Sequence, residues 1–218
     1  MHDTAEPLTE QAYRLLEERI VTLELEPGRF VSEAALAEEV GLGRTPIREA
    51  LQRLAREGLV VVLPRKGIQV ATMDSAQQLL VLEVRRELER LLSRLAARRA
   101  TVDERARFRS LADGMDQAAA ANDDLAFMRL DRELNVLLSA AAHNEYAQGA
   151  MRLINGHSRR FWYQHYKGAA DLPQCARLHA GQARAVASGN ATAAALATDH
   201  LIDYTVSFTE AVQVVTTP

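Results

Sequence analysis

Residues 32–67 read SEAALAEEVGLGRTPIREALQRLAREGLVVVLPRKG, and this stretch decides the fold. Ser32 to Val40 has the apolar spacing of a short helix that begins with a serine N-cap. Gly41 and Gly43 then favour a tight turn, because glycine adopts backbone conformations that other residues avoid. The residues that follow, up to Gly58, predict a second helix with one apolar face.

The second helix has its own start signal. Thr45 is the predicted N-cap, with Pro46 at the first helical position, where its missing N–H costs nothing. Ile47, Leu51 and Leu54 recur at helical spacing and are expected to face a core. Two helices joined by a tight turn form a helix-turn-helix unit.

Two short runs rich in β-branched residues come next. LVVVLP (59–64) and IQVAT (68–72) are predicted as strands, joined by a turn at Arg65, Lys66 and Gly67. A helix-turn-helix followed by a hairpin is a winged helix-turn-helix.

Cations gather in this stretch, although the whole chain carries a formal net charge of −3. Residues 44–66 contain six Lys and Arg against two Glu. Arg44 and Arg48 lie four residues apart at the start of the second helix, on the side away from its apolar face. In a helix-turn-helix this end enters the major groove, where arginine can bind guanine O6 and N7. Thr45 and the free N–H groups of the same turn suit a phosphate.

The stretch resembles the DNA-binding domain of the GntR family of bacterial transcription regulators. The matching residues are Leu25, Pro27-Gly28, Glu33, Leu36-Ala37, Gly41, Arg44-Thr45-Pro46, Arg48-Glu49-Ala50-Leu51, Leu54 and Gly58-Leu59. The resemblance implies a double-stranded DNA operator, base contacts by Arg44 and Arg48, and a wing around Lys66 and Gly67 that reaches the minor groove. Arg65 and Lys66, at the tip of the hairpin, are placed to reach a neighbouring groove or the DNA backbone. Ala34 departs from the pattern, because some members carry a DNA-contacting arginine there.

Composition places the chain among helical intracellular proteins. It is 48% hydrophobic and only 5% aromatic, with abundant Ala and Leu. The one cysteine, Cys175, excludes an internal disulfide framework and fits a reducing compartment. There is no run of about 18 apolar residues, and the polar N-terminus is unlike a signal peptide. We expect a soluble, cytoplasmic protein that does not contact membranes.

The character of the sequence changes near residue 72. One amphipathic helix, Leu8 to Leu23, is predicted before the helix-turn-helix, whereas residues 74–213 show helical patterns alone. The expected fold is mainly α, with a winged helix-turn-helix of three helices and a β-hairpin over residues 1–72, and an all-α bundle of about six helices over 73–218. The predicted helices of the bundle are 75–99, 101–121, 123–142, 145–166, 173–187 and 190–214. The first of them is expected to bury Leu79, Leu82, Leu88, Leu91, Leu92 and Leu95.

A helical bundle behind this DNA reader resembles the FCD (FadR C-terminal domain) branch of the family. VRRELERLLSRLAARRA (84–100) is similar to the opening helix of that domain, and DRELNVLLSAAAHN (131–144) to a helix that often reads Asp-x3-His. The resemblance implies a divalent metal held by Asp131, Asn135, His179 and His200, and a small carboxylate effector held by that metal. Asn135 replaces a common histidine. Its amide oxygen is a neutral, harder ligand that should lower the affinity for borderline metals.

The residues themselves support part of this site. Asp131 and Asn135 are i and i+4 on one helix face, beside Leu134 and Leu138, so that face should point into the core. An inward Asp with two inward His is ligand chemistry found in zinc, nickel and manganese sites, with zinc the first expectation. The alternative is that the two histidines are ordinary core residues.

Arg85 is the predicted effector anchor. A buried guanidinium needs an anion, and a ligand carboxylate would serve. The alternative is a surface ion pair with Glu89, four residues later on the same helix.

These observations predict a regulator that is not an enzyme. No P-loop, dinucleotide fingerprint, Gly-x-Ser-x-Gly or His-Glu-x-x-His occurs. Residues 1–72 carry nine Lys and Arg against twelve Asp and Glu, so one domain alone should bind DNA weakly, which favours a homodimer on a palindromic operator. We expect a ligand-responsive repressor. The alternatives are a hydrolase-like protein whose metal activates water, or a metal-free ligand sensor joined to the same DNA reader.

Overall fold

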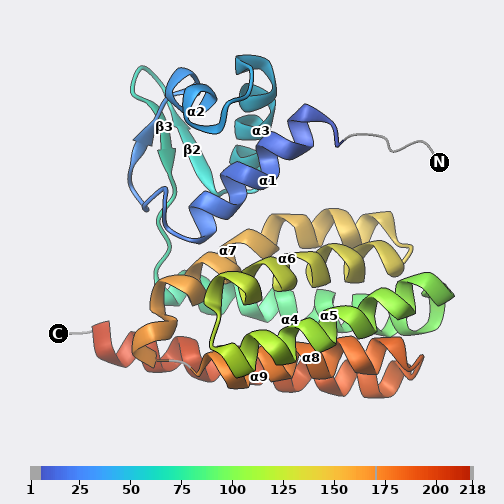
Figure 1. The fold of residues 1–218 in the computed structure, drawn as a ribbon. Coiled ribbons are helices and arrows are strands. Elements are labelled where there is room, and N and C mark those ends of the chain that lie inside the picture. The colour runs from blue at the N-terminus through green and yellow to red at the C-terminus, as the bar shows by residue number, and fades with distance from the viewer. Residues whose placement is uncertain (1–5, 170, 217–218) are drawn as a thin grey trace. The chain divides into compact units, whose positions relative to one another are not determined.

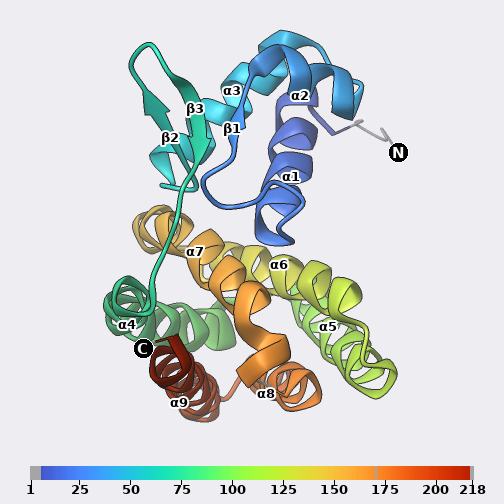
Figure 2. The ribbon, with the colours of Figure 1, turned by 90° about the vertical axis from the view of Figure 1, so that its left-hand side faces the viewer.

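The structure is a computed structural model that describes residues 6–169 and 171–216. The chain divides into two compact units. The first runs to Met73 and also takes in Arg159–Gln164, and the second holds Asp74–Ser158 and the chain from His165 onward. Figure 1 labels the helices and the strands β2 and β3, and Figure 2 also labels β1. The predicted domain boundary after residue 72 stays a prediction.

Over residues 6–73, the first unit contains three helices and a small antiparallel sheet (Figure 1). Its elements there are α1 (Leu8–Val21), β1 (Phe30–Val31), α2 (Glu33–Val40), α3 (Arg44–Arg56), β2 (Val60–Leu63) and β3 (Gly67–Val70). Residues 159–164 of this unit are part of helix α7 (Glu145–Ala169), which otherwise belongs to the second unit. The strand order is β1-β3-β2, so β3 is central. The predicted hairpin is confirmed, with Val60 opposite Val70 and Leu63 opposite Gly67. Strand β1, which pairs Phe30 with Gln69, was not predicted from the sequence.

The helix-turn-helix differs from the prediction in one respect, the residue that caps the N-terminus of α3. Ser32 caps α2 as expected, because its Oγ accepts the Ala35 N–H at 3.2 Å. Helix α3, however, begins at Arg44 with Gly43 as N-cap, so the prediction that Thr45 is the N-cap was wrong. Gly43 has an extended backbone and starts the helix earlier. Pro46 is still tolerated, because none of the first-turn N–H groups has an intrahelical partner.

The apolar face of α3 anchors the first unit as predicted. Ile47 and Leu54 are fully buried, and they share a core with Leu16 and Ile20 of α1. Because one side of α3 is committed to this core, the opposite side of the helix faces solvent.

A polar cluster locks α1 to α3. The Tyr13 hydroxyl donates to Glu57 Oε2 at 2.7 Å, and the Arg53 guanidinium lies 3.5 Å from the centroid of the Tyr13 ring. Arg53 also pairs with Glu10 at 2.8 Å and with Glu57 at 3.1 Å. Burial, together with the charges of Glu17 and Glu57, raises the pKa of Tyr13, so the phenol keeps its proton and remains a donor.

Removing the Tyr13 hydroxyl is expected to destabilise the first unit. Tyr13→Phe leaves the ring in place but deletes a buried hydrogen bond to a carboxylate, a bond worth about 1.5–3 kcal/mol. The free energy of unfolding, measured in urea, should fall by that amount. Tyr146→Phe is the control, because Tyr146 is 83% exposed. If both variants are equally stable, the hydrogen bond between Tyr13 and Glu57 does not stabilise the first unit.

The second unit is made of helices alone within the described residues. They are α4 (Ser75–Arg99), α5 (Val102–Ala121), α6 (Asp124–Ala141), α7 (Glu145–Ala169), α8 (Leu172–Ala187) and α9 (Ala191–Thr216). Figure 2 shows α4 and α9 nearly end-on and side by side, and α5 packs against α8. The predicted bundle of about six helices is confirmed. The first and last residues of the observed helices differ from the predicted ones by at most three positions.

Local signals set most of these helix ends. Thr101 and Glu104 form the start of α5 as a reciprocal capping box, with bonds of 3.2 and 2.7 Å. Asp123 caps α6 by accepting the Ala126 N–H at 2.9 Å. Asn122 before it adopts a left-handed conformation and ends α5.

The buried face of α4 is more polar than predicted. Leu82 and Leu92 are buried as expected, but Leu91 is exposed. The inward positions between them hold Arg85, Glu89 and other polar side chains. The spacing of the leucines therefore predicted the buried face of α4 only in part, because charged residues on this face pair with one another inside the bundle.

Candidate functional site

Helix α3 presents a polar face to solvent. Arg44, Thr45 and Arg48 are all exposed on it. Arg48 Nε lies 3.2 Å from Glu33 Oε2, and the two side chains keep 54% and 35% of their surface exposed. Glu33 opens α2, so this ion pair links the two helices of the helix-turn-helix. Residue spacing does not predict this role of Glu33, because contacts between two helices leave no periodic signal in the sequence.

The cations of this region divide into two groups. Arg53 lies in the Tyr13 cluster, so it serves the packing of α1 on α3. The sequence analysis counted it with the others. It also overlooked Gln52, an exposed amide one helical turn beyond Arg48 and on the same face. Amides at such positions can bind adenine.

The wing brings its polar residues to the tip of the hairpin. Arg65, Lys66 and Gly67 are exposed, at and beside the turn between β2 and β3. Arg65 has a φ of 64° and Gly67 a φ of 98°. A left-handed conformation is costly for arginine and free for glycine, so this turn shape is held by the hairpin pairing around it.

The second unit buries an ion pair on α4. Arg85 Nε lies 2.7 Å from Glu89 Oε2, and the residues are 6% and 1% exposed. Arg85 therefore points into the bundle, and the pair with Glu89 is not at the surface. Burial opposes the charged guanidinium, but the charges of Glu89 and Asp131 outweigh it and raise the pKa of Arg85. The cation is thus stably charged in the core.

Hydrogen bonds extend this pair to two further helices. Gln182 Nε2 of α8 donates to Glu89 Oε1 at 2.7 Å and to Thr198 Oγ1 of α9 at 3.0 Å. Ser93 Oγ lies 2.8 Å from the same Thr198 hydroxyl. Each of these side chains is buried. The network holds Glu89 in place and fixes the direction of Arg85.

Three of the four predicted metal ligands meet between α6 and α8. Asn135 Nδ2 donates to Asp131 Oδ1 at 2.8 Å, and His179 Nε2 lies 3.3 Å from the same oxygen. His179 Nδ1 lies 2.9 Å from the Cys175 carbonyl oxygen. Burial lowers the pKa of His179, but Cys175 and the hydrogen-bonded carboxylate of Asp131 outweigh this and raise the pKa well above its ordinary value.

The spacing of two of these side chains would suit a metal ion if His179 lost its proton. Two donors that share one zinc at about 2.0–2.1 Å lie about 3.3 Å apart when the geometry is tetrahedral, close to the 3.3 Å between His179 and Asp131. A backbone carbonyl on Nδ1 is also the common outer partner of a metal-binding histidine. The amide of Asn135 turns its Nδ2 group toward Asp131, so Asn135 could be a third ligand only through its Oδ1 oxygen.

His200 does not join this set. It is exposed on α9, whose inward positions are Ala194, Thr198 and Leu201. Each helical residue turns the direction of the side chain by about 100°, so a position next to Leu201 faces away from the core. Over residues 6–169 and 171–216, no cluster of three His, Cys, Asp or Glu could hold a metal. A site here would therefore need the amide of Asn135.

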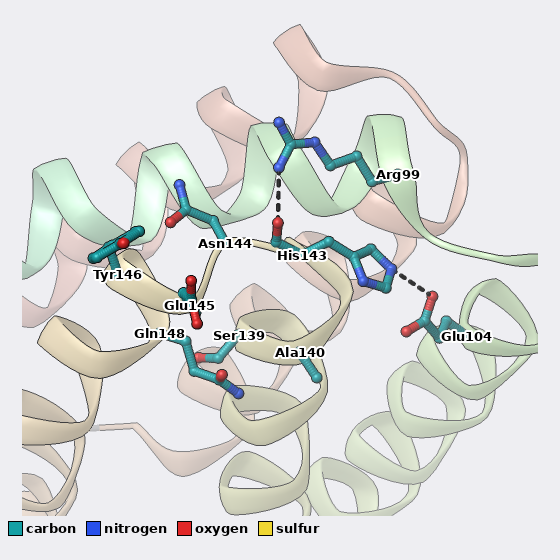
Figure 3. A pocket seen from close by; sticks show the side chains of 9 residues that line it. All are labelled: Arg99, Glu104, Ser139, Ala140, His143, Asn144, Glu145, Tyr146 and Gln148. Atoms are coloured by element: carbon teal, nitrogen blue, oxygen red, sulfur yellow. Dashed lines mark hydrogen bonds and ion pairs between the residues drawn. The ribbon is translucent and has the colours of Figure 1, made fainter.

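A surface pocket lies elsewhere on the second unit. This pocket has a volume of about 660 Å³. Figure 3 shows the side chains that line it, where the end of α4, the start of α5 and the turn between α6 and α7 meet. Arg99 donates to the His143 carbonyl oxygen at 3.1 Å, and His143 Nε2 lies 3.6 Å from Glu104 Oε2. Arg99, His143 and Glu104 therefore already have partners within the protein. None of the predicted site residues lines it.

Taken together, the winged helix-turn-helix and the all-helical unit define a DNA-binding transcription regulator. The family comparison agrees for both parts. Residues 8–70 match the gntR family of bacterial regulatory proteins, and residues 80–204 match the FCD domain. This chain belongs to the gntR family, in the branch that carries an FCD domain.

Similar proteins are regulators as well. An uncharacterised HTH-type transcriptional regulator from the TAR-I ttuE-ttuC' intergenic region of Agrobacterium vitis is 33% identical over 65% of this chain and 92% of its own. The HTH-type transcriptional repressor RspR of Escherichia coli is 33% identical over 42% of this chain and 40% of its own. The solved structure of E. coli McbR/YncC has the same fold, with a TM-score of 0.79 at 19% identity over 94% of this chain and 98% of its own.

These relatives decide between the function classes. They are transcription regulators and not enzymes, so the hydrolase alternative is rejected. Within the described residues, no helix combines the length and the apolar character that crossing a membrane requires.

Proposed function

We propose that this regulator is a homodimeric repressor that releases its DNA when a small carboxylate binds to the helical unit. The observation that carries the proposal is the buried guanidinium of Arg85. It is ion-paired with Glu89 and lies close enough to Asp131 for the two charges to attract each other. A guanidinium fixed inside a bundle can bind a ligand carboxylate through its remaining N–H groups. The sign of regulation is supported by RspR, a relative that is named as a repressor.

DNA reading is assigned to α3 and the wing. Arg44 and Arg48 would bind base edges in the major groove, while Thr45 and the first-turn N–H groups would bind a phosphate. Arg65, Lys66 and Gly67 would reach the neighbouring minor groove. Two copies related by a two-fold axis would read the half-sites of a palindromic operator.

Asp131, Asn135 and His179 are the proposed metal ligands. Zinc, or nickel or manganese, would supply a positive charge for the effector carboxylate. The Cys175 carbonyl would fix the ring of His179 and leave Nε2 toward the metal. His200 is left out because its side chain is exposed. That exposure also supports a second version of the proposal, in which Arg85 binds the carboxylate without a metal.

The effector response can be measured on the intact chain. A high-affinity duplex would be selected from a random pool, and its dissociation constant followed by fluorescence anisotropy with acetate, succinate or citrate. We expect at least one of these carboxylates to weaken DNA binding about tenfold or more and to raise the melting temperature of the free protein. If none of the three changes either quantity, the carboxylate proposal is wrong.

Metal content separates the two versions. His179→Ala should lower the metal bound per chain, measured by mass spectrometry on protein purified without chelator or affinity tag. His200→Ala should leave it unchanged, because that side chain faces solvent. Equal metal content in both variants and the parent would remove His179 from the ligand set. A parent without metal that still responds to a carboxylate would select the metal-free version.

A further inference from the structure

Helix α4 leaves one face uncovered on the second unit. Leu80, Val84 and Leu91 are 63%, 53% and 39% exposed, although each is a large apolar side chain. At about 100° per residue the three lie within an arc of about 40°, so they form one row along the helix. A row of this kind on a helix of 25 residues is unusual for a surface that stays in water.

Charges flank this row in a definite order. Glu83 and Glu87 lie beside the row, whereas Arg94 and Arg98 follow Leu91, its last member; all four are exposed on the same side of the helix. Among the described residues, only Glu87 of the four has an ion-pair partner in the chain, Arg90 at 3.8 Å. Farther round the helix on this same side, Arg86 and Arg90 already pair with Asp203 and Asp199 of α9.

We propose that this face of α4, comprising Leu80, Glu83, Val84, Glu87, Leu91, Arg94 and Arg98, binds the same face of a second copy in antiparallel orientation. The proposal rests on the proposed homodimer and names its surface. A two-fold axis near Leu91 would place Glu87 opposite the partner's Arg94, and Glu83 opposite the partner's Arg98. In an antiparallel pairing about a two-fold axis, the numbers of two facing residues always add up to the same value. Both pairs add up to 181, so a single register satisfies both.

Charge decides the orientation and the kind of partner. In a parallel pairing, the acidic half would face the acidic half and the basic half the basic half, and like charges across an interface disfavour it. In the antiparallel pairing, each half faces its opposite, and Leu91 meets its own copy at the centre. A face that complements itself about a two-fold axis is what an isologous dimer requires.

Charge reversal provides the test. In Glu87→Arg, each copy carries cations at both 87 and 94, and in Arg94→Glu, anions at both. Each variant alone should dimerise at least about tenfold more weakly than the parent, measured by analytical ultracentrifugation of the full chain. An equimolar mixture of the two variants should form a heterodimer, detectable by native mass spectrometry, because both cross pairs are then opposite in charge.

Controls separate this surface from the dimer itself. Glu133→Arg makes the same charge change on an exposed face of α6 and should leave dimerisation unchanged. Far-UV circular dichroism verifies that each variant is folded. If the single reversals dimerise like the parent, the surface is wrong while the homodimer stands. If they are monomers that do not recombine on mixing, the antiparallel register is wrong. A parent that stays monomeric would overturn both proposals.

Discussion

Arg48→Ala is expected to abolish discrimination between the operator and random DNA. A bidentate contact of arginine with guanine is worth about 1–3 kcal/mol against the wrong base. A two-fold dimer makes the contact twice, so about 2–6 kcal/mol of specificity should disappear, a loss of roughly thirtyfold or more. The measurement is anisotropy with the selected duplex and with a scrambled duplex at one fixed salt concentration.

The matched control for this experiment is Arg56→Ala. Arg56 is exposed on the same helix but lies at its C-terminal end, away from the turn that would enter the groove. Both variants lose one positive charge, so both should weaken binding to any DNA sequence. Only the Arg48→Ala variant should bind the selected and the scrambled duplex with equal affinity. Retained discrimination in Arg48→Ala would remove Arg48 from base recognition.

Arg85→Met is expected to destabilise the helical unit by about 3–5 kcal/mol. Breaking a buried ion pair leaves an uncompensated charge, here that of Glu89, in a core that is shielded from water. Arg86→Met is the control on the next residue. Arg86 keeps 28% of its side-chain surface exposed and pairs with Asp203, and exposed pairs contribute about 0–1 kcal/mol. Urea unfolding followed by circular dichroism gives both values.

A double variant separates stability from ligand binding. Arg85→Met with Glu89→Gln removes both charges and keeps the shapes, so much of the lost stability should return. The carboxylate response should stay absent, because the guanidinium is gone. A double variant that still responds to the carboxylate would show that Arg85 is not the anchor. A single variant as stable as Arg86→Met would contradict the buried pair.

Signals within a few neighbouring residues predicted most of the fold. The capping box at Thr101 and the serine cap at Ser32 fixed helix ends, because both depend on contacts between near neighbours in the chain. Strand β1 escaped prediction for the opposite reason. It has only two residues, and its partner β3 lies nearly forty residues away. The predicted cap of α3 was wrong because Gly43, Thr45 and Pro46, within four residues of one another, all permit a helix start.

In the candidate site, too, contacts between near neighbours in the chain could be predicted, and contacts between distant residues could not. Asp131 and Asn135 were placed correctly on a core face, since they are four residues apart on one helix. Arg85 could not be oriented from the sequence, because its inward direction depends on Gln182 and Thr198 holding Glu89 from two other helices. His200 was misplaced for a geometric reason. One residue of difference in α9 turns a side chain from the core to solvent.

The ion pair between Glu33 and Arg48 bears on how a regulator searches a chromosome. A protein that slides along DNA is slowed by every favourable contact with a random phosphate. In the free protein the Arg48 guanidinium already has a carboxylate partner, Glu33, so an arbitrary phosphate gains little by replacing it. A guanine that accepts two hydrogen bonds gains more. Glu33 would therefore shorten the time spent at wrong sequences, at some cost in overall affinity, and so speed arrival at the operator.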